Sequence, residues 1–188
     1  MATQESRQLD GSLRPSAQTE PAPGAIITAG AAKFLAVFRV VLGFEFLWAF
    51  LDKTFGLGYA TPTARAWING GSPTKGFLSR VAVGPFEATF HAWAGAAWAD
   101  WLFMAGLLGI GVALILGIGM RIATVSAVLM LAMMYLASFP LETNPIIDDH
   151  VVDALAIATL GLLGAGDVYG LGRWWKALPI VQRIHWLA

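Results

Sequence analysis

Long apolar runs alternate with short polar stretches along this chain. Four runs contain few charged residues, and they lie at about residues 34–52, 98–120, 122–139 and 149–166. A helix needs about 20 predominantly apolar residues to cross the hydrocarbon core of a bilayer. The pattern therefore predicts an all-α protein whose residues 31–170 form a transmembrane four-helix bundle.

The segments outside these runs differ in composition. Residues 1–30 are rich in Gln, Ser, Pro and Thr, so we expect a disordered tail rather than a secretory signal. Residues 171–188 alternate Trp with Arg and Lys, which is typical of an amphipathic segment at the level of the lipid headgroups. The connector from Asp52 to about Ala97 is aromatic and Gly-rich, which predicts short interfacial or re-entrant helices that cap one end of the bundle.

The composition also points to lipid surroundings. Of the 188 residues 57% are hydrophobic and 13% are charged, and the mean hydropathy is +0.65. A soluble domain carries about a quarter charged residues. Twelve Lys and Arg balance twelve Asp and Glu, so no basic excess favours nucleic acid as a partner. The chain has no cysteine, which excludes a disulfide, a thiolate-bound iron–sulfur cluster and a catalytic thiol.

Basic residues outside the four runs are distributed unequally. Seven lie on the side that would carry both termini, and four lie in the long connector on the other side. The positive-inside rule therefore predicts that both termini are cytoplasmic.

Small residues recur every four positions in the second run, at Ala105, Gly109, Ala113 and Gly117. Such spacing places small side chains on one helix face, where a neighbouring helix can approach closely. We therefore expect this face to be a helix contact.

Glu45 lies near the middle of the first run, where an ionisable side chain costs about 2.5–3.5 kcal/mol on insertion scales. Asp52 follows on the same helix face, and Trp48 lies beside them. Either Glu45 carries a proton to or from a buried ligand, or it is protonated and hydrogen-bonds a neighbouring helix. Arg39, about 120° around the helix, either contacts a ligand or extends its charged end to the inner headgroups.

Ionisable residues also gather where the fourth run begins. Asp148 and Asp149 suit a helix N-terminus. His150 and Asp153 lie three residues apart on one face, which favours a proton relay or a donor to a quinone carbonyl, because imidazole titrates near neutral pH. His91 either joins this group or packs on a nearby tryptophan. We expect no metal or haem, because one His with carboxylates at this spacing matches no recognised signature.

Four segments carry a family resemblance: FRVVLGFEFLWAFLDKTFG, GGSPTKGFL, WLFMAGLLGIGVALILGIGMR and NPIIDDHVVDALAIATLGLLGAGDVYGLGRWW. Over about residues 33–178 the chain resembles the DoxX/DoxD family of four-helix membrane proteins, and above all the large membrane subunits of thiosulfate:quinone oxidoreductase. The resemblance implies a protein of the bacterial plasma membrane that passes electrons from thiosulfate to membrane quinone, its bound co-substrate, together with a smaller or soluble redox partner subunit.

Two functions from different classes follow. In the first, the chain is a redox subunit with quinone between its first and fourth helices; the catalytic residues are then Glu45, His150 and Asp153, and the quinone-binding residues are Arg39, Trp48, Asp52, His91 and Asp149. In the second, it is a non-enzymatic membrane scaffold that recruits a soluble redox or detoxifying partner. A small-solute carrier is a third alternative, and the sequence leaves self-association open.

Overall fold

The computed structural model describes residues 28–141 and 144–187, and all regular secondary structure within these ranges is helical. Four helices are long: α1 (Ala29–Phe55), α4 (Ala97–Leu116), α5 (Met120–Ala137) and α6 (Asp149–Leu162). The shorter elements are η1 (Thr63–Arg65), η2 (Trp67–Asn69), α2 (Lys75–Leu78), α3 (Glu87–Trp93), η3 (Ala165–Asp167), α7 (Gly172–Ala177), α8 (Pro179–Arg183) and η4 (His185–Leu187).

Helices α1, α4 and α5 are each long and apolar enough to cross a membrane. They lie where the first three spans are predicted. Helix α6 has 14 residues and a length of about 21 Å, which is less than the roughly 30 Å of a hydrocarbon core. It ends before the predicted residue 166 because Gly164 adopts a left-handed conformation, with φ of 64°, that interrupts the helix.

Helix α1 begins earlier than the sequence pattern predicts. The Thr28 hydroxyl oxygen accepts a hydrogen bond from the backbone N–H of Ala31 at 3.2 Å, which caps the helix. Residues 29 and 30 are therefore helical, although they belong to the predicted tail. The rest of that tail, residues 1–27, lies outside the described residues.

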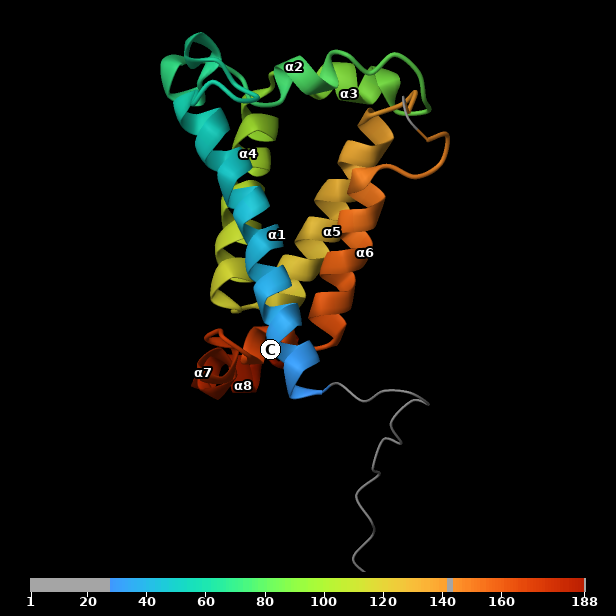
Figure 1. The fold of residues 1–188 in the computed structure, drawn as a ribbon. Helices are drawn as coiled ribbons and strands as arrows, with labels where there is room; N and C mark the ends of the chain where they lie inside the picture. Colours follow the sequence, from blue (N-terminus) through green and yellow to red (C-terminus); the bar gives the residue numbers. More distant parts are fainter. Residues whose placement is uncertain (1–27, 142–143, 188) are drawn as a thin grey trace, which may run out of the picture.

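The long helices are arranged as two pairs, α1 with α4 and α5 with α6, and α4 also contacts α5. Figure 1 shows that the pairs converge near α7 and α8 and diverge toward α2 and α3, which lie across the other end. We call these the terminal end and the connector end. The first residues of α1 also lie at the terminal end.

Glycines bring α1 and α4 close together. A Cβ atom at Gly111 would lie 2.8 Å from the Leu47 backbone nitrogen, and one at Gly43 would lie 2.9 Å from the Leu114 Cβ. Helix contacts of this kind need residues without side chains.

The predicted small-residue face is not this contact. A Cβ atom at Gly109 would meet no atom within 4 Å. Gly117 ends α4 as its left-handed C-cap, with φ of 71°. The expectation of a close helix on this face is therefore wrong, because α1 packs beside Gly111, about 160° around the helix from Gly109.

Candidate functional site

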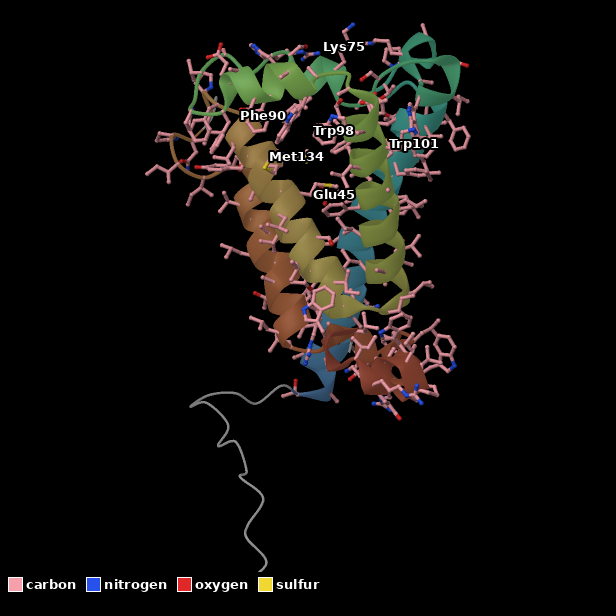
Figure 2. All side chains as sticks on the ribbon, turned by 180° about the vertical axis from the view of Figure 1, so that it is seen from behind. Glu45, Lys75, Phe90, Trp98, Trp101 and Met134 are labelled. Carbon is pink, nitrogen blue, oxygen red and sulfur yellow. The ribbon has the colours of Figure 1, made fainter. Side chains whose placement is uncertain are left out.

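A cavity of about 670 Å³ lies between α4 and α5 at the connector end. Its walls are aromatic and methionine side chains, and Figure 2 shows Phe90, Trp98 and Met134 around it. We call it the aromatic cavity, and its walls are mainly Phe77, Phe90, Trp93, Trp98, Phe103, Met130, Met133 and Met134. Its volume falls in the range of small-molecule sites, about 300–1,000 Å³.

The aromatic walls are fixed by ring contacts. Trp93 meets Phe90 with ring centroids 6.1 Å apart and Trp98 at 5.3 Å, and both pairs are edge to face. From α5, Met130, Met133 and Met134 share one helix face and also line the cavity. Methionine side chains are flexible and polarizable, so this wall adapts to a ligand.

A hydrogen-bond network holds the connector over the start of α4. Asp100 is 7% exposed, and its Oδ1 accepts hydrogen bonds from the Ser72 hydroxyl at 2.9 Å, the Thr74 N–H at 3.0 Å and the Thr74 hydroxyl at 2.6 Å. The Gly95 N–H donates to the Thr74 hydroxyl oxygen at 3.2 Å. Because Thr74 also lines the aromatic cavity, this network positions one edge of it.

Lys53, in the last turn of α1, also lines the aromatic cavity. Its side chain is half-buried, and within residues 28–141 and 144–187 its ammonium forms no hydrogen bond or ion pair. The adjacent Asp52 is 1% exposed and lies under the loop after α1, where its Oδ1 accepts from the Tyr59 N–H at 3.3 Å. The predicted ligand contact, Asp52, is thus placed in the protein interior, and its neighbour Lys53 reaches the cavity.

Apart from Lys53, a group of ionisable residues lies on α1 and α6. Glu45 interacts electrostatically with Asp149, His150 and Asp153. Its side chain is not covered by protein, although it lies in the middle of the molecule (Figure 2). The structure thus brings together all three predicted catalytic residues, Glu45, His150 and Asp153, with Asp149 beside them.

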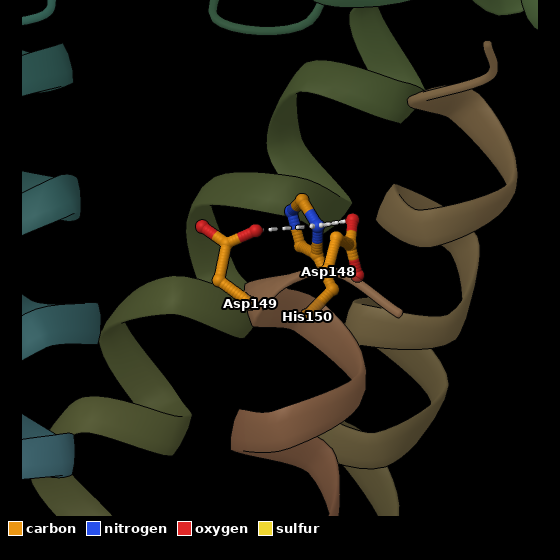
Figure 3. Close-up of side chains that lie close together, drawn as sticks. All are labelled: Asp148, Asp149 and His150. Carbon is orange, nitrogen blue, oxygen red and sulfur yellow. Dashed lines mark hydrogen bonds and ion pairs between the residues drawn. The ribbon is translucent and has the colours of Figure 1, made fainter. Parts of the chain in front are cut away.

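The partner of His150 differs from the predicted one. Its Nδ1 lies 2.7 Å from Asp148 Oδ2 and 3.6 Å from Asp149 Oδ1, as Figure 3 shows. Asp148 also caps α6, since its Oδ1 accepts from the Val151 N–H at 3.2 Å. The donor atoms of these two aspartates and His150 lie within 4.8 Å of one another and could take a cation, but Asp149 is exposed and Asp148 is already engaged as the cap.

Arg39 is fully buried and does not reach the headgroups. Its guanidinium donates to the carbonyl oxygens of Leu114 at 2.8 Å, Tyr169 at 3.0 Å and Val168 at 3.5 Å. The Leu114 carbonyl lies in the last turn of α4, where carbonyls have no partner within the helix and carry the negative end of the helix dipole. Arg39 therefore ties together α1, α4 and the segment after η3 at the terminal end.

The remaining predicted contacts, Trp48 and His91, do not line the aromatic cavity. Trp48 packs on Phe44 and Tyr59, with ring centroids 6.0 and 5.2 Å away. His91 has its Nε2 2.9 Å from the Val81 carbonyl oxygen, which holds α3 against the preceding loop.

Sequence reasoning missed the cation and the methionine wall of the aromatic cavity. The three methionines follow the i, i+3, i+4 spacing of one helix face, a signal that was available. No such signal marked Lys53, because adjacent helix positions point about 100° apart and only the packing decides which one faces the cavity.

Comparisons with family models, with curated proteins and with solved structures find no match for this chain. The described part of the chain is helical, with three helices long and apolar enough to cross a membrane, an aromatic cavity between α4 and α5, and a group of interacting ionisable residues on α1 and α6.

Proposed function

We propose that this chain is a four-helix membrane subunit of the DoxX/DoxD type that binds a membrane quinone in the aromatic cavity and reduces it with electrons from a partner subunit. The observation that carries the proposal is the cavity of about 670 Å³, with its aromatic and methionine walls and the cationic side chain of Lys53. In this proposal α6 is the fourth span. The start of α1 and the C-terminal helices lie at one end (Figure 1), which supports an even number of crossings, and the distribution of basic residues favours the cytoplasm for that end.

The chemistry of the walls suits a quinone ring. Flat rings pack edge to face or offset against aromatic side chains, and thioether sulfur makes favourable contacts with ring edges. Quinone carbonyl oxygens only accept hydrogen bonds, and a Lys ammonium only donates them. Lys53 is therefore suited to hold one carbonyl and to stabilise the negative charge that arrives with electrons.

Quinone reduction to quinol takes up two electrons and two protons. Glu45 and the ionisable residues of α6 are suited to supply the protons. Positions 45, 49 and 53 form one ridge of α1, so Glu45 lies about 12 Å along the helix axis from Lys53. The two side chains also lie about 80° apart around the helix axis, so the acid is offset from the amine rather than directly beside it.

The electrons come from outside this chain. Oxidation of two thiosulfate ions to tetrathionate releases two electrons, which matches one quinone. The chain has no thiol to activate sulfur, and the acidic residues at the start of α6 repel a dianion. We therefore assign sulfur oxidation to the partner subunit and quinone binding to this chain.

The test is anaerobic reduction of a soluble quinone analogue by thiosulfate, with full-length protein in lipid nanodiscs, with and without co-purifying partners. We expect reduction only with the partners. Glu45→Gln should lower turnover by about 10²–10⁴-fold, the contribution of a positioned proton donor, and leave insertion and quinone binding intact. Glu87→Gln, which alters an acid of α3 outside both groups, is the matched control and should keep full turnover.

Normal turnover of Glu45→Gln would reject its proton role. If the wild-type chain with its partners neither binds nor reduces quinone, the redox function is wrong. Partner capture in mild detergent without quinone chemistry would then favour the scaffold alternative.

A further inference from the structure

A second cavity of about 280 Å³ runs along α4 and α5 toward the terminal end. It shares four lining residues with the aromatic cavity, namely Ala105, Gly106, Ile110 and Ser126, so the two cavities adjoin each other. At its far end it is lined by Trp175 of α7. We call this second cavity the tail groove.

The floor of the tail groove consists of the small residues that the sequence pattern predicted to be a helix contact. Ala105, Gly109 and Ala113 line it, and no helix of the described chain fills it, since a Cβ atom at Gly109 would meet no atom within 4 Å. At Gly106 a Cβ atom would collide with the Met130 methyl group, a flexible end that can move aside. The groove is therefore narrow, apolar and open over at least two helical turns, about 12 Å between positions 105 and 113.

The two cavities differ in polarity, and this difference defines the orientation of an amphiphilic molecule that would occupy both. Lys53 is the only charged residue that lines either cavity in the described part of the chain, and it lies at the connector end. A charged ammonium that is partly withdrawn from water is costly unless it meets a hydrogen-bond acceptor. The Lys53 ammonium therefore favours an electronegative oxygen at this end, while the tail groove is lined by apolar side chains and the Ser126 hydroxyl.

We propose that the two cavities hold one amphiphilic molecule, a quinone whose ring lies in the aromatic cavity with a carbonyl oxygen on Lys53, and whose apolar tail extends along the tail groove toward Trp175. This inference rests on the proposed function and adds to it the direction of the ligand and a separate binding site for the tail. Gly109 is then a specificity-determining residue, because its missing side chain leaves room for the tail.

The experiment measures binding of two probes to the full chain in nanodiscs: a benzoquinone with a ten-carbon alkyl tail, and the same ring without the tail. Quenching of tryptophan fluorescence reports binding, since Trp93 and Trp98 line the aromatic cavity. Gly109→Leu places a branched side chain in the groove at a position where a Cβ atom meets no atom within 4 Å, and Leu108→Phe adds bulk to an exposed position of α4 outside both cavities as the matched control. Gly109→Ala gives an intermediate size.

We expect Gly109→Leu to weaken the tailed probe at least tenfold and to leave the tail-less probe within twofold of wild type. Gly109→Ala should have a smaller effect in the same direction, and Leu108→Phe should change neither affinity. Lys53→Met should weaken both probes, whereas Lys75→Met, which removes an exposed lysine of the connector, should weaken neither.

Unchanged affinity of Gly109→Leu for the tailed probe would overturn the inference while ring binding by the wild type still supports the proposed function. An equal loss for both probes would also overturn it, because the groove would then not bind the tail separately. Failure of the wild type to bind either probe would refute the proposed function itself. If Gly109→Leu instead changes the oligomeric state, the groove is a contact between copies of the chain, and the inference is wrong.

Discussion

Replacing Arg39 tests whether this buried cation supports the fold or the ligand. Its side chain is 0% exposed, and it donates to the Leu114 carbonyl at 2.8 Å and the Tyr169 carbonyl at 3.0 Å. Hydrogen bonds to a charged group contribute about 1.5–3 kcal/mol each, so Arg39→Leu removes about 3–6 kcal/mol. Removing a buried charge returns part of its desolvation cost, so we expect a net loss of about 3 kcal/mol in unfolding free energy.

Arg39→Lys separates charge from geometry. An ammonium is a compact donor that lacks the planar fork of guanidinium, so it cannot hold the carbonyls of α4 and of the segment after η3 together in the same way. We expect it to lose about half as much unfolding free energy as Arg39→Leu. Arg65→Leu, at an exposed arginine of η1, is the control and should stay within about 0.5 kcal/mol of wild type.

The first assay is reversible unfolding in mixed detergent and sodium dodecyl sulfate micelles, followed by tryptophan fluorescence. The second is quinone binding, measured where each variant is fully folded. The structure predicts loss of stability with quinone affinity unchanged for the folded fraction. Unchanged stability with lost quinone affinity would refute this reasoning and show that Arg39 contacts the ligand.

Two further predictions concern packing and the connector. Gly111→Ala should lower the unfolding free energy by about 1–3 kcal/mol, because its Cβ would lie 2.8 Å from the Leu47 backbone nitrogen. Gly109→Ala, where a Cβ meets no atom within 4 Å, should raise it by up to about 1 kcal/mol. Equal effects of the two variants in the same unfolding assay would contradict the α1–α4 contact. Asp100→Ala removes the oxygen that accepts hydrogen bonds from Ser72 and Thr74. Amide hydrogen exchange should therefore become faster in residues 72–78 and stay unchanged at the terminal end. A uniform increase in exchange would show instead that Asp100 supports the whole fold.

The positions of the three long apolar helices could be predicted because each helix satisfies its own backbone hydrogen bonds in lipid, so hydropathy and length are sufficient. The short length of α6 could not be predicted, because Gly164 ends the helix within a sequence that is still apolar. The four-residue spacing predicts that Ala105, Gly109 and Ala113 share one helix face, and all three line the same groove. Whether a helix or an open groove faces them depends on how α4 packs, which spacing alone does not define.

The candidate site was predictable only in part. Glu45 and Asp153 could be selected from the sequence because an ionisable side chain in an apolar segment costs free energy unless it has a partner or a function. The structure places the two side chains within electrostatic reach of each other. The contacts of Arg39 join residues 129 and 130 positions apart in the chain, so no local pattern reveals them. Lys53 was overlooked beside Asp52 for the same reason: only tertiary structure shows which of two neighbours faces the cavity.

The central claim is that quinone occupies the aromatic cavity, and photoaffinity labelling tests it most directly. Membranes containing the full chain are irradiated with a ring-azido quinone, and the labelled peptides are identified by mass spectrometry with excess unlabelled quinone as competitor. The account predicts competed labelling on α4 near Trp98 and on α5 near Met130–Met134. Competed labelling confined to α1 and α6 around Glu45 and Asp153, with none on α4 or α5, would contradict it.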